Sequence, residues 1–136
     1  MGCKPVIVLD THALIWWVTN SSKLSTKARK LIEAAARNRT VVTSAISIFE
    51  IATAARRGRL EFNIPVDAWL HALGQMTELG IEPITAEIAR IAASFDDVMP
   101  GDPADRIIAA TTLTLNARLV TKDTRLNKIK QLKIAW

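Results

Sequence analysis

Four carboxylates come from four separate segments of the chain, and each borders an apolar run. They are Asp10, Glu50, Asp105 and Asp123. Carboxylates gathered in a pocket of low dielectric constant repel one another, so a fold that brings them together needs a cation there. A hard divalent ion with oxygen ligands meets that need. The spacing of these acids therefore suggests a metal centre built from distant parts of the chain.

Each acid, taken singly, also has a structural explanation. Asp10 and Asp123 both follow apolar runs and could cap the helices expected after them. Glu50 could be an exposed helix residue that pairs with the basic residues Arg56 and Arg57. Capping does not exclude metal binding, so both interpretations stay open for the single residues.

The segment from Asp102 to Asp105 contains two acids whose roles differ. Asp-Pro-Ala-Asp is typical of a helix start, with Asp102 as the N-cap and Asp105 in the first turn, where both complement free amides and the helix dipole. That explanation covers Asp102 fully. Asp105 is followed by an apolar stretch over residues 107–109, so its helix should be buried. We expect Asp105 to be the primary ligand and Asp102 an auxiliary one.

Together, acids at strand ends and helix starts are what a two-metal phosphodiester site requires. Two hard cations clamp the scissile phosphate, one lowering the pKa of a water and the other stabilising the leaving oxygen. Thr121 and Thr124 place hydroxyls beside Asp123, where they could bind a metal-bound water or satisfy backbone groups. The hypothesis at this point is a metal-dependent cleavage of phosphodiester bonds.

The composition is that of one compact domain. The chain has 136 residues, 49% of them hydrophobic, which is enough to form a hydrophobic core. We therefore expect a single domain over residues 1–136. No apolar run could span a membrane, and we find no signal-peptide pattern. Cys3 is the single cysteine and cannot form an internal disulfide, which favours the cytoplasm. The net charge of +5 weakly favours a polyanionic partner such as nucleic acid.

The chain alternates short apolar runs with helical patterns, which predicts an α/β fold. Expected strands are residues 5–10, 41–43, 81–84, 118–121 and 132–135. Expected helices are residues 11–18, 25–38, 44–58, 65–80, 85–95 and 102–116, with a short helix before the last strand. Strands separated by helices pair in parallel through right-handed crossovers, and sites form at their carboxyl ends. A shared pocket for the acids is therefore plausible on topology alone.

Basic and aromatic residues flank the acidic segments. Charge runs are usually solvated faces, but a basic rim around an acidic pocket is also what RNA needs, and we assign Arg56, Arg57, Lys122 and Arg125 to it.

Two aromatic features of the helix after Asp10 carry separate expectations. Trp16 and Trp17 are adjacent on this helix, so we expect one buried and one half-buried, or one at a partner surface. His12 is expected to be a packing or surface residue, with no role as a base.

At four places in order, residues 9–17, 44–52, 102–110 and 119–123, the chain resembles PIN-domain ribonucleases, and among them the VapC toxins of toxin–antitoxin pairs. The resemblance implies a Rossmann-like PIN fold with a central parallel sheet flanked by helices on both sides. It implies Mg²⁺- or Mn²⁺-dependent hydrolysis of RNA in which a metal-activated water attacks phosphorus. The family's acids fall on the four carboxylates named first, with Asp102 as an extra acid and Thr11 and Thr121 as hydroxyls near the metal.

The resemblance also implies partners: an RNA substrate, a cognate antitoxin docked along the N-terminal helices, and a second copy in a homodimer. Two other functions stay open. One is a PIN-like module that binds RNA or protein without cutting. The other is a phosphoryl-transfer receiver or phosphatase of similar topology, which would form a phosphorylated Asp10.

Overall fold

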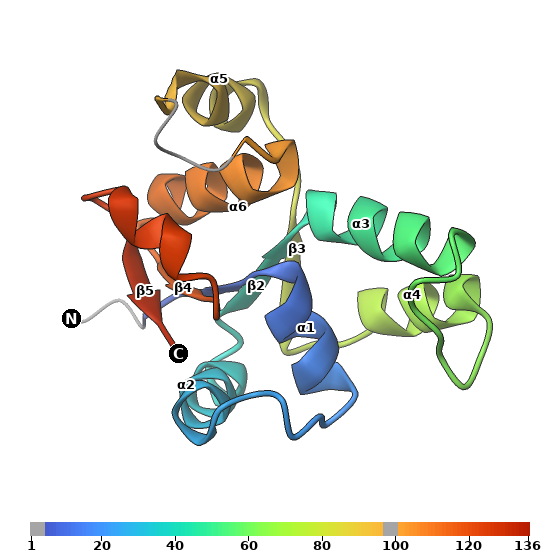
Figure 1. Ribbon diagram of the computed structural model, residues 1–136. Helices are drawn as coiled ribbons and strands as arrows, with labels where there is room; N and C mark the ends of the chain where they lie inside the picture. Colours follow the sequence, from blue (N-terminus) through green and yellow to red (C-terminus); the bar gives the residue numbers. More distant parts are fainter. Residues whose placement is uncertain (1–4, 97–100) are drawn as a thin grey trace.

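Five parallel strands form the centre of the molecule (Figure 1). The computed structural model describes residues 5–96 and 101–136, so Cys3 lies outside the described residues. The strands lie in the order β3-β2-β1-β4-β5. Their bounds are β1 Ile7–Leu9, β2 Val41–Ser44, β3 Leu79–Glu82, β4 Arg118–Val120 and β5 Lys133–Ala135.

Helices connect the strands and cover both faces of the sheet, as the sequence pattern predicts (Figure 1). Their bounds are α1 Thr11–Val18, α2 Thr26–Arg37, α3 Ala45–Arg56, α4 Val66–Gly74, α5 Ala86–Ser94, α6 Pro103–Thr114 and the 3₁₀ helix η1 Thr124–Lys128. None of the helices in the described segments is long and apolar enough to cross a membrane.

The side chains of β1 point alternately to the two faces of the sheet and so contribute to both parts of the core. Ile7 and Leu9 belong to a cluster with the buried side chains of α1 and α2, while Val8 packs with Ile108 of α6 and with Leu119 of β4. All three β1 side chains are almost fully buried, since helices lie on both sides. α5 covers α6 from outside, as Figure 1 shows. The central strand is thus held rigidly, and so is the backbone at its carboxyl end.

The topology places the functional segments at one edge of the sheet. The chain runs from β1 outward to β2 and β3, and then returns to the other side of β1 for β4 and β5. The order therefore reverses between β1 and β4, whose carboxyl ends lie side by side, with Leu9 opposite Val120. A reversal of this kind leaves a crevice outside the strand ends. Asp10 and Asp123 follow the two strands that flank it.

The largest error in the expected elements is in the middle of the chain. We expected a helix up to Gly80 and a strand from Ile81, but α4 ends at Gly74 and β3 begins at Leu79. Leu79 is buried, and β3 pairs with β2 in a register that sets Leu79 opposite Val41. The glycine interpreted as a helix end lies inside the edge strand, where burial of Leu79 and pairing to β2 outweigh the helical pattern.

The two adjacent tryptophans of α1 also differ from expectation. Neither Trp16 nor Trp17 is fully buried; both are half-buried and pack against the first core cluster. The expectation of one buried and one half-buried side chain was wrong. Trp16 also contacts Trp136 edge to face, with 5.8 Å between ring centroids. The C-terminal residue therefore helps to hold Trp16 in place.

Candidate active site

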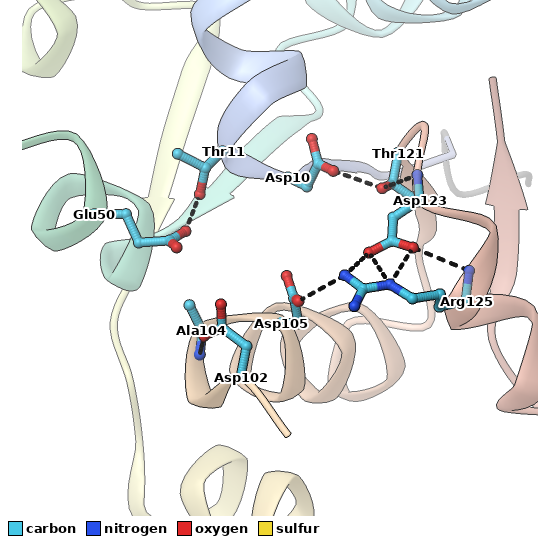
Figure 2. A network of polar contacts seen from close by, with 9 residues as sticks. All are labelled: Asp10, Thr11, Glu50, Asp102, Ala104, Asp105, Thr121, Asp123 and Arg125. Carbon is cyan, nitrogen blue, oxygen red and sulfur yellow. Dashed lines mark hydrogen bonds and ion pairs between the residues drawn. The ribbon is translucent and has the colours of Figure 1, made fainter. Parts of the chain in front are cut away.

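A pocket of about 750 Å³ opens at the carboxyl ends of the strands. Five carboxylates from different elements line it. They are Asp10, Glu50, Asp102, Asp105 and Asp123. Figure 2 shows these side chains around one space, with Asp10 at the start of α1, Glu50 on α3 and Asp105 on α6. The structure thus brings together the acids that the sequence analysis selected.

Asp10 both caps α1 and is anchored to the neighbouring strand. Its Oδ1 accepts from the backbone N–H of Ala13 at 2.8 Å, and its Oδ2 accepts from the hydroxyl of Thr121 at 2.5 Å. Burial raises the pKa of Asp10, and these two hydrogen bonds oppose that rise. The capping explanation is therefore correct, and it leaves a half-buried carboxylate with a fixed orientation at the pocket.

Glu50 is held by a hydroxyl of α1. The Thr11 hydroxyl donates to Glu50 Oε1 and lies 2.9 Å from the hydroxyl of Ser47, which is fully buried (Figure 2). Within the described segments no ion pair joins Glu50 to Arg56 or Arg57. Burial raises the pKa of Glu50, the bond from Thr11 lowers it, and the charge of Asp102 raises it further. The surface-pair interpretation of Glu50 is wrong.

Asp102 is the N-cap of α6 and Asp105 lies in its first turn, at the positions that the sequence predicts. Asp102 is exposed and caps the helix by accepting from the N–H of Ala104 at 2.9 Å. Asp105 is half-buried, and its pKa is raised to about 6, first by burial and then by the charges of Asp102, Asp123 and Glu50. Three other carboxylates therefore lie close enough to Asp105 to disfavour its charged form. A bound cation would relieve this repulsion.

Arg125 partly neutralises the pocket at Asp123. Its guanidinium lies 2.6 Å from Asp123 Oδ2 and 3.7 Å from Asp105 Oδ2, as Figure 2 shows. The hydrogen bonds from Arg125 hold the pKa of Asp123 below its usual range. Asp123 also caps η1, and its own N–H donates to Thr121 at 3.0 Å. Thr121 thus connects Asp10 to the backbone of Asp123 across the β1–β4 crevice.

Cations from separate segments also line this pocket. Lys122 and Arg125 do so, as predicted, together with Lys23 and Arg59, which the RNA-binding assignment did not include. Arg56 and Arg57 are exposed at the end of α3 and are not among the lining residues. The basic run after Glu50 therefore reaches the pocket through Arg59.

Comparison with known proteins identifies the family. The family model of the PIN domain matches residues 7–132. Ribonuclease VapC22 of Mycobacterium tuberculosis is 40% identical over 121 residues, which are 88% of each chain. The chain is a PIN-domain protein of the VapC family. The resemblance seen in the sequence is thereby confirmed, and so is the PIN fold.

Solved structures of other PIN-domain proteins share the fold at low identity. VapBC2 from Rickettsia felis, crystallised with a promoter DNA fragment, superimposes with a TM-score of 0.72 at 18% identity, covering 96% of this chain and 97% of that one. DNA-bound VapBC from Salmonella typhimurium gives 0.69 at 16% identity, covering 97% and 98%. At these identities the likeness establishes the architecture alone.

The donor set of this VapC-family pocket suits a hard divalent ion, although it forms no closed cage. Within residues 5–96 and 101–136, no three acidic, histidine or cysteine side chains stand close enough to enclose a metal. Mg²⁺ uses one or two carboxylates and keeps several waters, so an open ring of oxygens is compatible with it. The raised pKa of Asp105, caused partly by neighbouring acids, gives the ring a reason to take up a cation.

The sequence analysis of this PIN domain missed several residues that line the pocket. His12 and Trp16 lie one turn apart on α1, and Lys23 follows that helix. His12 and Trp16 are four residues apart on the helix that starts at Asp10, so the sequence already indicates that they share one face of a helix that begins at an acid. Lys23 gave none, because a lone lysine in a loop is indistinguishable from any solvated one.

Proposed function

We propose that this protein is the ribonuclease toxin of a VapBC-type pair, an Mg²⁺- or Mn²⁺-dependent endoribonuclease. The observation that carries the proposal is the convergence of five carboxylates from separate elements on one pocket. Nothing in the packing of the core calls for that arrangement, and the charges of Asp102, Asp123 and Glu50 help to raise the pKa of Asp105. A site for cleaving phosphodiester bonds calls for it directly.

In this proposal the chain's own residues hold and orient the reacting groups. Asp10, Asp105 and Asp123 would carry the ion most directly, with Glu50 and Asp102 completing the acidic ring. When bound, the ion would neutralise phosphate charge and lower the pKa of a water. Thr121 and Thr11 set the directions of the Asp10 and Glu50 carboxylates through the hydrogen bonds that they donate.

RNA is the proposed substrate because cations surround the acids. Lys122 and Arg125 come from the segment after β4, Lys23 from the loop after α1 and Arg59 from the loop after α3, and all four line the pocket. These cations would form ion pairs with the phosphates next to the scissile one. Such ion pairs supply affinity without base specificity. The single cysteine fits a reducing compartment, and we infer the cytoplasm as the site of action.

An antitoxin is the proposed protein partner, and a homodimer the proposed state of the toxin. A second pocket, of about 550 Å³, lies between α1, residues 60–64 and α4, and Val18, Phe62 and Trp69 supply apolar lining. An apolar peptide segment fits such a groove. A toxin–antitoxin complex from Klebsiella pneumoniae shares the fold, with a TM-score of 0.64 at 18% identity over 96% of each chain. Light scattering of the purified chain tests the dimer.

The decisive experiment compares RNA ends in cells that express the wild type or Asp10→Asn. Asn caps a helix as well as Asp, so the variant should fold. We expect new 5′ ends at a defined sequence with the wild type and none with Asp10→Asn. Glu33→Gln changes an exposed acid on α2 and should leave the cleavage pattern intact. Identical ends from the wild type and Asp10→Asn would refute the proposal.

The non-catalytic alternative makes a different prediction for purified protein. A module that only binds RNA should retain RNA unchanged in the presence of Mn²⁺, and any trace of cleavage in Asp105→Asn would equal that of the wild type. Membership of the PIN family removes the basis for a phosphoryl-transfer receiver. Mass spectrometry for phosphorylated Asp10 would check that point.

A further inference from the structure

The acidic pocket continues beyond the carboxylates into a region with different chemistry. Its further lining comes from α1 through His12 and Trp16, and from α3 through Ile51 and Ala54. Trp16, Ile51 and Ala54 offer no oxygen ligand to a hard metal ion, and His12 adds a second aromatic ring beside Trp16. One pocket thus combines an oxygen-rich part and a hydrophobic part, which matches a ligand that carries both charge and flat apolar surface.

The aromatic part is a supported surface. His12 and Trp16 are four residues apart on α1, so they lie on the same face of the helix. Their ring centroids are 5.5 Å apart with an interplanar angle of 35°. Trp136 contacts Trp16 from another side, edge to face. His12 is exposed and Trp16 half-buried, so both can offer a ring to a ligand while Trp16 stays fixed by its neighbours.

Two of the cations that line the pocket come from the segments that follow α1 and α3. α1 begins at the acids, where Thr11 donates to Glu50, and its 8 residues lead away from them over about 12 Å. Lys23 follows this helix and Arg59 follows α3, and both line the pocket. Besides its carboxylates, the pocket therefore presents aromatic rings and cations from the segments that follow α1 and α3.

We propose that the space between α1 and α3 is a nucleotide subsite for single-stranded RNA. The base next to the scissile phosphate stacks on His12 and Trp16, and the following phosphate pairs with Lys23 and Arg59. The strand must be single, because a base can present its face to a side chain only when it has left its own stack. The inference rests on the proposed function for the choice of RNA: an ion held by the carboxylates would take the scissile phosphate, the rings would take the neighbouring base, and the cations would take the next phosphate.

The test measures binding rather than cleavage. All proteins carry Asp105→Asn, which stops cleavage and removes one carboxylate from the pocket. Fluorescence anisotropy with a labelled single-stranded RNA octamer, in Mg²⁺, gives the dissociation constant. We expect His12→Ala and Trp16→Leu to weaken binding about tenfold, as loss of one stacking partner does. Trp17→Leu is the matched control, since Trp17 is half-buried on the same helix but does not line the pocket.

The RNA is varied in parallel by removing one base at a time. In the protein with intact Trp16, one abasic position should cost about the same tenfold, and in Trp16→Leu that position should cost nothing more. Circular dichroism verifies folding, and Trp16→Phe should restore most of the affinity. Binding that is indifferent to every abasic position, or equally weakened by Trp17→Leu, would overturn the subsite.

Two further outcomes separate the inference from the proposed function. If base-dependent binding is found but the wild type cleaves no RNA with any divalent metal, the subsite stands and the nuclease assignment fails. If the wild type cleaves RNA while the His12 and Trp16 variants bind it normally, the subsite alone fails. Loss of antitoxin binding with unchanged RNA binding in these variants would make the surface a protein-docking site and would also overturn the proposal.

Discussion

At the scale of single residues, Asp105 carries a clear electrostatic cost in the pocket. Its pKa is raised from 3.8 to about 6, so the Asp105 carboxyl binds a proton more tightly in the folded protein than in the unfolded chain. The stability that Asp105 contributes is therefore lost as the pH rises from about 4 to about 6. Asp123 has the opposite sign: its lowered pKa contributes stability that is lost only as the pH falls below its usual range.

We predict that Asp105→Asn stabilises the metal-free protein at pH 7. The gain should be about 1 kcal/mol, because the side chain is 26% exposed and solvent screens the repulsion. Urea unfolding in EDTA at pH 4 and pH 7 provides the measurement, and the two proteins should be equally stable at pH 4. Mg²⁺ should stabilise the wild type more than the variant at pH 7. A variant that is less stable than the wild type at both pH values would contradict this electrostatic explanation.

Arg125 is a cation that the chain itself supplies to two of the proposed metal ligands. Its side chain is exposed, so its bonds to Asp123 are worth little against water. We predict that Arg125→Ala binds Mn²⁺ up to about fivefold more tightly than the wild type, since the ion no longer competes with the guanidinium. Calorimetry without RNA measures this. Lys128→Ala removes a nearby exposed charge and should not change the affinity; weaker Mn²⁺ binding in Arg125→Ala would disprove the competition.

At the scale of elements, the site depends on how the ends of β1 and β4 are joined. Thr121 is buried, donates to Asp10 and accepts from the N–H of Asp123. Thr121→Val keeps the shape but frees Asp10 and leaves a backbone donor unpaired, so we predict a loss of about 1–3 kcal/mol in stability. Cleavage should fall at least about tenfold, because small misplacements of reacting groups are costly.

Thr43→Val is the control for this prediction. Thr43 is equally buried on neighbouring β2, but its hydroxyl donates to the backbone of Leu9 at 3.4 Å and touches none of the acids. Its cleavage rate should match that of the wild type. Equal losses of activity in the two variants would mean that general packing, and not the Asp10–Thr121 bond, sets the rate.

The helices and strands also show how much of the structure could be predicted from the sequence. Asp10, Asp102 and Asp123 were recognisable as helix starts because capping is a local signal, and the parallel topology then implied that they meet. The boundary between α4 and β3 was not recognisable, because Gly80 is typical of a helix end and only pairing to β2 makes it part of a strand. Arg125 was assigned to RNA. Its bonds to Asp123 join residues only two positions apart, but the sequence does not show that the turn into η1 brings the guanidinium back onto that carboxylate.

At the scale of the whole molecule, the charge distribution governs approach to RNA. The chain carries a net charge of +5 although five of its 13 acids line one pocket, so positive charge predominates over the rest of the chain. If the four lining cations meet phosphates, the logarithm of RNA affinity should fall with the logarithm of salt concentration with a slope of about −2 to −3. Between 50 and 200 mM salt this means a loss of roughly 15- to 60-fold. Filter binding of Asp105→Asn measures it, and an affinity indifferent to salt would refute the phosphate contacts.

The capped acids have a consequence for when the protein is ready to act. Because Asp10, Asp102 and Asp123 already satisfy backbone amides at the starts of α1, α6 and η1, these helices need no ion to form. In small zinc domains, by contrast, folding waits for the metal. Here an ion can arrive and leave while the architecture persists, so the supply of free magnesium, and not the time needed to refold, would govern readiness.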